Sequence, residues 1–328
     1  MSSLGTFALL FLLSTLIVGA GIAVLVALGW APLRRRLHRL HPDQRTHVLQ
    51  ALLAAPVVGG LLQTVVGLAP GVLGYIWPAL DHCLVHGGLE HPHLCVAHVT
   101  AAGDATLGVW LVTAALAVVL LPLAFEIARW ARGIRLTSAL FRGSDYDPGL
   151  DAFIAPSQSP LAATDYRGRV VVSRGLLDEL SHDHLHAVLH HEREHARRRD
   201  PLRLLYAALV SVGHLPWVRR ALLADLALAC EQACDEQAAR KVGGRLVVAE
   251  ALLTVERLLG RSVPRGAAVA YFAGEHLVAR VESLLAPTHG LGAGLPRRPL
   301  MAAGVTASAT LAHPLHHVVE SLAGLLGA

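Results

Sequence analysis

The sequence predicts a mainly helical membrane protein, with about four transmembrane helices and a polar α+β domain inserted between the third and the fourth. Three observations lead to this fold class. Hydrophobic residues make up 54% of the 328-residue chain and charged residues only 16%, with a mean hydropathy of +0.50. Several apolar runs approach the length of about 20 residues that a spanning helix needs. Arginines gather directly after some of these runs, as they do at cytoplasmic membrane faces.

The first apolar run covers residues 4–28 and carries no charge. It is long enough to cross a hydrocarbon core of about 30 Å. No basic residue precedes it and no clear cleavage site follows it, so we do not expect a removed signal peptide. Five arginines come directly after it: Arg34, Arg35, Arg36, Arg39 and Arg45. The positive-inside rule therefore predicts that this segment is cytoplasmic and that the N-terminus lies outside.

Two further spans are expected at about residues 48–76 and 105–125, which completes a membrane region of residues 1–126. We expect the second span to be irregular because of its prolines and glycines, namely Pro56, Gly59, Gly60, Pro70 and Gly71. Residues 81–104, between the two spans, contain no Lys or Arg, which fits an outer loop. Three arginines follow the third span: Arg129, Arg132 and Arg135. We therefore expect the chain to return to the cytoplasm there.

The expected outer loop is rich in cysteine and histidine. Cys83 and Cys95 would lie in a compartment where a disulfide can form. Five histidines surround them: His82, His86, His91, His93 and His98. Two interpretations stay open, a loop closed by a disulfide and a site for a soft or borderline metal ion. The disulfide-closed loop is the simpler of the two.

Residues 127–298 form the predicted cytoplasmic domain. Residues 169–173 are expected to be a strand, because β-branched residues follow one another there. Such a strand could lie at the edge of a substrate cleft, or equally in the core of the domain. The apolar run at residues 204–215 is too short for a span, so we expect a buried or membrane-surface helix. Residues 299–328 are expected to supply the fourth span, at about 299–312, and a short outer tail.

The strongest signal for chemistry starts at His191, where the sequence reads H-E-x-x-H. Ser181 suits a helix N-cap upstream, and an apolar stripe with helical spacing follows it. On a helix, His191 and His195 share one face with their β-carbons about 6 Å apart, so both imidazoles can bind one zinc ion. Glu192 lies beside them, where its carboxylate can take a proton from a metal-activated water, as amide hydrolysis requires. The alternative is a chance occurrence in a polar, histidine-rich helix.

A catalytic zinc ion usually has three protein ligands, so a third is expected elsewhere in the chain. Glu231 and Asp235 lie four residues apart in a stretch that is compatible with a helix. Glu231 can complete the zinc site, while Asp235 can accept the ring N–H of a ligand histidine. A solvated acidic helix face is the alternative for this pair. Cys230 and Cys234 flank Glu231; they could approach the metal, but buried packing is the expected role.

The stretch H-E-R-E-H-A-R-R-R-D-P-L, followed by H-L-P-W and E-Q-A-C-D-E, resembles the membrane zinc peptidases typified by the β-lactam antirepressors of the BlaR/MecR kind, in the gluzincin group. The close resemblance covers about residues 169–239. It implies that His191, His195 and Glu231 hold one zinc ion per chain and that Glu192 is the general base. Sensing members of that family cleave a cytoplasmic DNA-binding repressor. No penicillin-binding sensor domain follows the last expected span, so β-lactam sensing is not expected.

These observations predict an integral zinc-dependent endopeptidase of a bacterial-type inner membrane, with its active site in the cytoplasm. Its expected role is that of a signal-responsive antirepressor, and its expected partners are a cytoplasmic DNA-binding repressor and membrane lipid. A housekeeping peptidase that removes damaged membrane proteins is the first alternative. A non-catalytic metal-binding sensor or scaffold is the second. Glu192 argues against that second alternative, because metal binding alone needs no general base.

The sequence leaves parts of the site and some partners undetermined. Tyr206 and Arg240 are both conceivable as the residue that stabilises the oxyanion. Direct nucleic-acid binding is not expected despite the pI of about 9.1, because aromatic residues make up only 5% and no basic-aromatic motif is found. The sequence indicates neither the oligomeric state nor the inducing signal.

Overall fold

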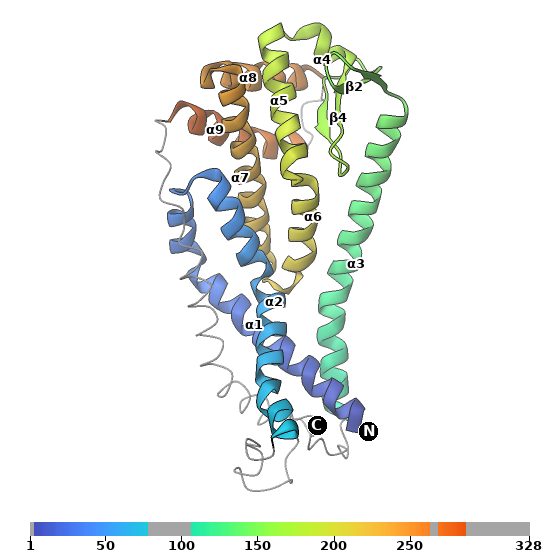
Figure 1. Ribbon diagram of the computed structural model, residues 1–328, viewed down its shortest axis with the longest axis vertical. Coiled ribbons are helices and arrows are strands. Elements are labelled where there is room, and N and C mark those ends of the chain that lie inside the picture. Colours follow the sequence, from blue (N-terminus) through green and yellow to red (C-terminus); the bar gives the residue numbers. More distant parts are fainter. Residues whose placement is uncertain (1–2, 78–105, 263–267, 287–328) are drawn as a thin grey trace.

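The computed structural model describes residues 3–77, 106–262 and 268–286 of the chain (Figure 1). Two predictions lie outside these residues, namely the outer loop at 81–104 with its possible disulfide and the fourth span at 299–312. Both stay predictions. The described part of the chain is mostly helical and contains one small sheet, which agrees with the expected mainly helical fold.

Three long helices make up the N-terminal part of the structure: α1 (Ser3–Leu37), α2 (Pro42–Ile76) and α3 (Thr106–Arg142). Each contains a stretch that is long and apolar enough to cross a membrane: Phe11–Leu37, Pro42–Gly67 and Thr113–Arg142. Large apolar side chains on these helices are exposed, among them Leu28, Leu62 and Phe125, as suits helices that face lipid. Each helix is longer than its predicted span, and the predicted domain boundary at residue 127 lies inside α3.

The second helix is continuous, which corrects the expectation of an irregular second span. Its glycines allow a close approach to α1. A Cβ atom on Gly60 would lie 2.6 Å from the carbonyl oxygen of Thr15, and one on Gly19 would lie 2.8 Å from that of Pro56. Glycines at such positions let two membrane helices pack backbone against backbone. The glycine pattern therefore reflects helix–helix packing and not a break in the helix.

The sheet follows α3 and has four strands: β1 (Asp145–Asp147), β2 (Ala152–Ala155), β3 (Ala162–Thr164) and β4 (Val170–Ser173). The strand order is β1-β2-β4-β3. Because β4 pairs in parallel with β2 and antiparallel with β3, it lies inside the sheet, and β3 forms the edge.

The strand predicted at residues 169–173 is present as β4. Of the two places left open for it, the core of the domain is confirmed and the edge of a cleft is wrong. All four β4 residues are buried, with relative exposures between 0% and 5%. Val170 and Val172 pack with Leu189 in one hydrophobic cluster, and Val171 packs with Phe141 in another. An unbroken run of β-branched residues is typical of a strand that is buried on both faces. The edge position belongs to the less conspicuous β3.

The sheet leads into α4 (Arg174–Glu179) and then into α5 (His182–Arg198). The predicted N-cap of α5 is confirmed, since the Ser181 hydroxyl accepts a hydrogen bond from the backbone N–H of His184. The helix ends at Arg199, which has a left-handed conformation with φ of 54°. α6 therefore starts at once, in a new direction.

The next three elements form a hairpin: α6 (Asp200–Val210), the 3-10 turn η3 (Ser211–Gly213) and α7 (Pro216–Val242). Its tip packs against the middle of the α2 span. His214 Nε2 lies 3.0 Å from the Leu52 carbonyl oxygen, and a Cβ atom on Gly213 would lie 3.3 Å from Pro56 Cβ. The apolar run at residues 204–215 is therefore not one helix but the turning end of this hairpin. α7 then returns toward α5 (Figure 1).

Two shorter helices, α8 (Arg245–Ser262) and α9 (Ala268–Leu285), complete the described fold. One core cluster joins four helices through Ala187 of α5, Ala238 of α7, Val248 of α8 and Leu284 of α9. A second cluster joins α7 to α1 and α2. α7 therefore connects the membrane helices with the helices around the candidate site.

Candidate metal centre

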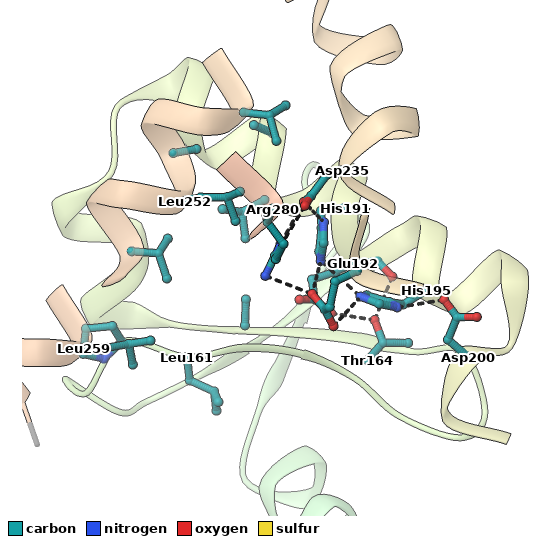
Figure 2. A pocket seen from close by; sticks show the side chains of 18 of the residues that line it. Leu161, Thr164, His191, Glu192, His195, Asp200, Asp235, Leu252, Leu259 and Arg280 are labelled. Atoms are coloured by element: carbon teal, nitrogen blue, oxygen red, sulfur yellow. Dashed lines mark hydrogen bonds and ion pairs between the residues drawn. The ribbon is translucent and has the colours of Figure 1, made fainter. Parts of the chain in front are cut away.

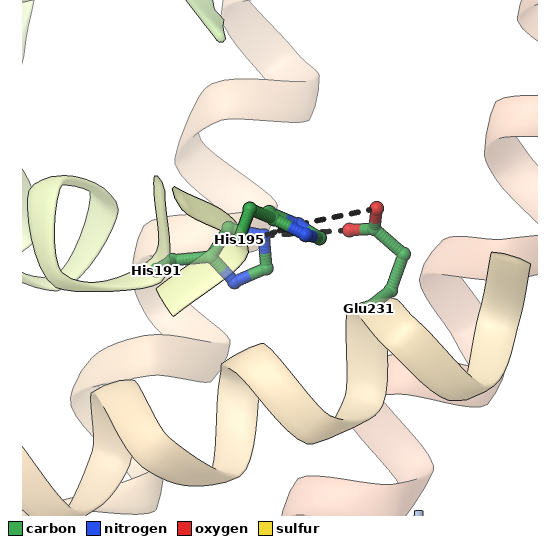
Figure 3. Close-up of side chains that lie close together, drawn as sticks. All are labelled: His191, His195 and Glu231. Carbon is green, nitrogen blue, oxygen red and sulfur yellow. Dashed lines mark hydrogen bonds and ion pairs between the residues drawn. The ribbon is translucent and has the colours of Figure 1, made fainter. Parts of the chain in front are cut away.

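α5 and α7 bring three possible metal ligands together (Figure 3). His191 and His195 lie one turn apart on α5, and their Nε2 atoms are 3.1 Å apart. α7 presents Glu231 to this pair. Its Oε2 atom lies 3.4 Å from His191 Nε2, and its Oε1 atom lies 3.5 Å from His195 Nε2. The three residues that the sequence singled out as ligands therefore converge on one point.

The spacing and chemistry of these three groups fit a zinc ion. Zinc bonds of about 2.0–2.1 Å in a tetrahedral site separate neighbouring ligand atoms by about 3.3 Å. The three observed separations lie between 3.1 and 3.5 Å. Two imidazoles and one carboxylate are a known ligand set of catalytic zinc, in which the fourth position is left for water or substrate. The assignment of these residues as zinc ligands stays a prediction that the geometry supports.

Asp235 holds the outer nitrogen of His191. His191 Nδ1 lies 2.9 Å from Asp235 Oδ1, which is within hydrogen-bonding distance. Burial disfavours a charged His191, but Asp235 and Glu231 together outweigh it and raise the pKa of the imidazole. A hydrogen bond at Nδ1 leaves Nε2 free to bind a metal and fixes the orientation of the ring. This is the role that the sequence predicted for Asp235.

Asp200 holds His195 in the same way, and sequence reasoning missed it. His195 Nδ1 lies 3.0 Å from Asp200 Oδ2. Burial lowers the pKa of His195, but the contacts with Asp200, Cys234 and Glu231 together outweigh it, so the pKa is raised. Asp200 itself is almost completely buried and is also paired with Arg198 and Arg203. The available signal was an acidic residue at the first position of a helix, five residues after a ligand histidine.

Cys234 approaches His195 from the same side as Asp200. Its Sγ atom lies 3.4 Å from His195 Nδ1 and 3.5 Å from Asp200 Oδ2. These three residues form a second group whose ligand atoms are close enough for a metal ion. However, burial raises the pKa of the Cys234 thiol to about 12, and the charges of Arg198 and Arg203 neutralise Asp200. Cys234 therefore acts as a buried neutral thiol, as the sequence led us to expect.

Arg280 of α9 is the second residue that sequence reasoning missed. Its Nε and NH2 atoms donate to the two carboxylate oxygens of Asp235 at 2.8 and 2.7 Å. Its NH1 atom lies 2.9 Å from Glu231 Oε2. Burial disfavours the charged form of Glu231, but Arg280 and the two histidines together outweigh it and keep the pKa of Glu231 well below its usual range. A single arginine in a mainly apolar helical stretch was the available signal, because a buried cation needs acidic partners.

Neither residue considered for the oxyanion lies at the site. Tyr206 is exposed on α6, and Arg240 pairs with Glu236 on the surface of α7. Neither of them lines the cavity that contains the three ligands.

That cavity has a volume of about 540 Å³ and combines the metal centre with an apolar wall (Figure 2). Glu192 lines it, and Glu192 Oε2 lies 2.8 Å from the hydroxyl oxygen of Thr164 on β3. The same hydroxyl lies 2.7 Å from the Glu192 carbonyl oxygen. Five residues of α8 form much of the apolar wall: Val248, Ala251, Leu252, Val255 and Leu259. The cavity therefore offers a general base, a metal site and room for apolar side chains.

Comparison with known proteins points to the same chemistry. The family model described as peptidase family M48 matches residues 127–259. The matched part contains the three candidate ligands together with Glu192 and Asp235, whereas α9 with Arg280 lies beyond it. No curated protein and no solved structure matches the chain. Peptidases of family M48 are zinc metalloproteases, so the match, together with the three apolar helices, indicates a membrane-associated zinc metallopeptidase.

Proposed function

We propose that this chain is an integral membrane zinc endopeptidase whose site faces the cytoplasm. The observation that carries the proposal is the convergence of His191, His195 and Glu231 within 3.1 to 3.5 Å in a cavity that Glu192 also lines. Zinc, when bound, supplies Lewis-acid polarisation of the scissile carbonyl and of the attacking water. A scaffold that only bound metal would not need the Glu192 carboxylate beside the fourth coordination position of the zinc.

Glu192 is the proposed general base. Its carboxylate takes a proton from the attacking water and passes it to the leaving amine. Thr164 holds this carboxylate in the cavity, because its hydroxyl lies within hydrogen-bonding distance of Glu192 Oε2. A threonine hydroxyl carries only one proton, and the Glu192 carbonyl oxygen competes for it. The carboxylate is therefore restrained without being fully neutralised, as a base that must exchange protons requires.

Arg280 is a positioning residue in this proposal. Two of its guanidinium nitrogens face the carboxylate of Asp235, and the third faces the carboxylate of Glu231. The arginine therefore locks the ligand Glu231 and the partner of His191 into one arrangement. Its charge also acts on Glu192 at longer range.

The substrate is proposed to bind as an extended strand along β3, in place of the earlier expectation at residues 169–173. Ser173 N donates to Leu161 O at 2.8 Å, and Asp165 N donates to Arg169 O at 3.0 Å. In an antiparallel pair the hydrogen-bonding direction alternates, so the N–H and C=O groups of Ala162 and Thr164 point away from β4. Both residues line the cavity. An added strand would pair there and pass across the metal site.

The leading substrate is proposed to be a cytoplasmic DNA-binding repressor. Two observations support it. The H-E-R-E-H-A-R-R-R-D-P-L stretch resembles the sensing peptidases, and the positive-inside rule applied to the arginines predicts that the domain is cytoplasmic. Cleavage of damaged membrane proteins is the second candidate. Trp130 of α3 and Leu204 of α6 line the same cavity, so the site reaches a candidate membrane helix and could accept a segment that emerges from the bilayer.

The activity is tested with the full chain in lipid nanodiscs. Wild type, Glu192→Gln and Glu194→Gln are assayed for zinc content and for cleavage of unfolded casein. Glu194 is a matched control, because it lies on α5 but pairs with Arg197 and does not line the cavity. Glu192→Gln should keep its zinc and lose about 10²–10⁴-fold in turnover, while Glu194→Gln should cleave like wild type. Equal cleavage by wild type and Glu192→Gln would refute the assigned base.

The substrate is tested in cells. The Glu192→Gln variant should trap its substrate, which can be crosslinked and identified by mass spectrometry. Capture of a small DNA-binding protein that wild type cleaves supports the antirepressor role. Capture of misfolded membrane proteins alone would contradict it and support the housekeeping role.

A further inference from the structure

We infer that the membrane helix α2 sets the geometry of the metal ligand His195 through a chain of charges formed by Asp43, Arg198 and Asp200. This inference concerns the regulation of the proposed zinc site and rests on that proposal. It assigns Asp43 and Arg198 as positioning residues that act through Asp200.

The first link joins the membrane helix to the helix that carries both histidines. Asp43 lies in the first turn of α2, and Arg198 lies in the last turn of α5. Arg198 NH1 and Asp43 Oδ1 form an ion pair. The Arg198 side chain is only 6% exposed, whereas that of Asp43 is 38% exposed. Arg198 is therefore a buried cation that depends on the carboxylates around it.

The second link joins Arg198 to the ligand. Arg198 Nε lies 3.2 Å from Asp200 Oδ2, and this is the same oxygen that lies 3.0 Å from His195 Nδ1. The second oxygen, Oδ1, lies 3.1 Å from Arg203 NH1. One carboxylate oxygen thus serves both the ligand histidine and the arginine that Asp43 holds. When Asp43 is replaced by a neutral residue, Arg198 interacts more strongly with Asp200 and weakens the bond of Asp200 to His195.

The first turn of α2 also reaches the opposite side of the metal centre. Arg45 of α2 donates to the side-chain carbonyl of Gln232, which is the residue next to Glu231. The Gln232 amide in turn donates to the Ala279 carbonyl oxygen at 2.9 Å, next to Arg280. The first turn of α2 therefore contacts Arg198 on α5 and Gln232 on α7, and Gln232 extends this connection to Ala279 on α9.

These contacts define a regulatory input. α2 contains a candidate membrane span, Pro42–Gly67, so any signal that moves this span moves Asp43. A shift of α2 relative to α5 would change the Arg198 pairing and with it the orientation of His195. The zinc site would then respond to a change in the membrane region, with no contact between the signal and the cavity.

The structure offers a matched control for general loosening of the membrane interface. Arg34 of α1 donates to both carboxylate oxygens of Asp225 on α7, at 2.7 and 2.8 Å. This ion pair also joins a membrane helix to a ligand-bearing helix. Among the described residues, however, Asp225 contacts no ligand and no residue that orients one through its side chain. Its loss should affect stability and leave the metal geometry unchanged.

The test compares Asp43→Asn, Asp43→Glu and Asp225→Asn in the full chain in nanodiscs. Zinc affinity is measured by competition with a chelator, and cobalt(II) substitution reports the ligand geometry through its visible absorption spectrum. Asp43→Asn should weaken zinc binding about tenfold and alter the cobalt spectrum, since disturbing groups that orient ligands typically costs 10–100-fold. Asp43→Glu should restore both properties, because it keeps the charge. Asp225→Asn should match wild type in both, even where it lowers the thermal unfolding midpoint.

A double variant tests whether the effect passes through Asp200. If the chain of charges is correct, Asp43→Asn should have no further effect on zinc affinity in an Asp200→Asn background. Additive losses would overturn the inference, as would equal losses in Asp43→Asn and Asp225→Asn. A folded Asp43→Asn variant with wild-type zinc affinity and cobalt spectrum would also overturn it. Wild type that binds no zinc at all would instead refute the proposed function on which the inference rests.

Discussion

Each candidate ligand histidine is held by a buried carboxylate, and each carboxylate is held by arginine. Asp235 faces His191 Nδ1 and is paired with Arg280, whereas Asp200 faces His195 Nδ1 and is paired with Arg198. These contacts leave the two Nε2 atoms directed at one another and at Glu231. The orientation of the rings is therefore supported by carboxylates and arginines of the protein itself.

Asp235→Asn should weaken zinc binding by about 10–100-fold, because the amide no longer stabilises His191 and leaves Arg280 with one charged partner fewer. Glu236→Gln is the matched control, since Glu236 is the next residue on α7 and pairs with Arg240 and Arg245. Chelator competition on both variants checks the difference. Equal affinities in the two variants would mean that Asp235 does not orient the ligand.

Zinc binding should release protons at neutral pH. The pKa values of His191 and His195 are raised, so both imidazoles hold their protons more tightly than free histidines do. A bound metal needs neutral imidazole, so those protons must leave, and zinc affinity should rise between about pH 6 and about pH 8. Calorimetry in buffers of different ionisation enthalpy measures the release. A binding enthalpy that is the same in every buffer would contradict the raised pKa values.

At the scale of elements, the edge strand β3 and the helix α5 build the active side of the cavity together. Thr164 of β3 holds the Glu192 carboxylate, and Ala162 lies two residues away on the same edge. The proposed substrate strand would therefore be positioned by the same strand that restrains the base. The buried β4 supports this arrangement from the inside of the sheet.

Ala162→Pro tests this use of the edge. Its N–H points away from β4, so proline removes a hydrogen bond to substrate without breaking the sheet. We expect kcat/KM for casein to fall about fivefold, as the loss of about 1 kcal/mol implies, with zinc content unchanged. Ala162→Val keeps the N–H and serves as the control. A proline variant with full activity would show that the substrate does not pair with β3.

At the scale of the whole molecule, the hairpin of α6 and α7 joins the membrane helices to the metal centre. Its tip packs beside Leu52 and Pro56 of α2, and its far end carries Glu231. The apolar run of about a dozen residues ends in the turn η3, so we expect no single membrane crossing there. Both the sheet and α8 should therefore lie in one compartment.

Labelling of introduced cysteines checks this topology. Asp145→Cys and Lys241→Cys place exposed thiols at the start of β1 and after the candidate ligand on α7, in chains whose Cys83 and Cys95 are replaced by serine. A membrane-impermeant reagent should label both positions only when the cytoplasmic side is accessible. Labelling from opposite sides would mean that the hairpin crosses the membrane.

Local patterns allowed much of this site to be predicted. The H-E-x-x-H spacing depends only on one helix, and Ser181 identified where that helix begins. Glu231 and Asp235 were found from spacing within a second helix and from family resemblance. Asp200 and Arg280 were not found, because their roles depend on partners that packing brings together. Arg280 lies 45 residues from Asp235 in the chain.

The arrangement of the sheet shows the same limit. The valines of β4 identified a strand, but strand order depends on contacts between distant segments, and an unbroken apolar run belongs inside a sheet. The three candidate spans among the described residues were each predicted to within a helix, since length and hydropathy decide them. The continuation of these helices into the domain was not predicted, because polar helical turns beyond a span give no hydropathy signal.

Zinc binding by His191, His195 and Glu231 can be measured by X-ray absorption at the zinc edge of the purified full chain. We expect one zinc ion per chain with nitrogen and oxygen ligands at about 2.0–2.2 Å, an imidazole signature from two rings, and loss of the metal in Glu231→Ala. A sulfur ligand at about 2.3 Å would instead place the ion beside Cys234 and refute this ligand set. Zinc that is retained unchanged in Glu231→Ala would contradict it equally.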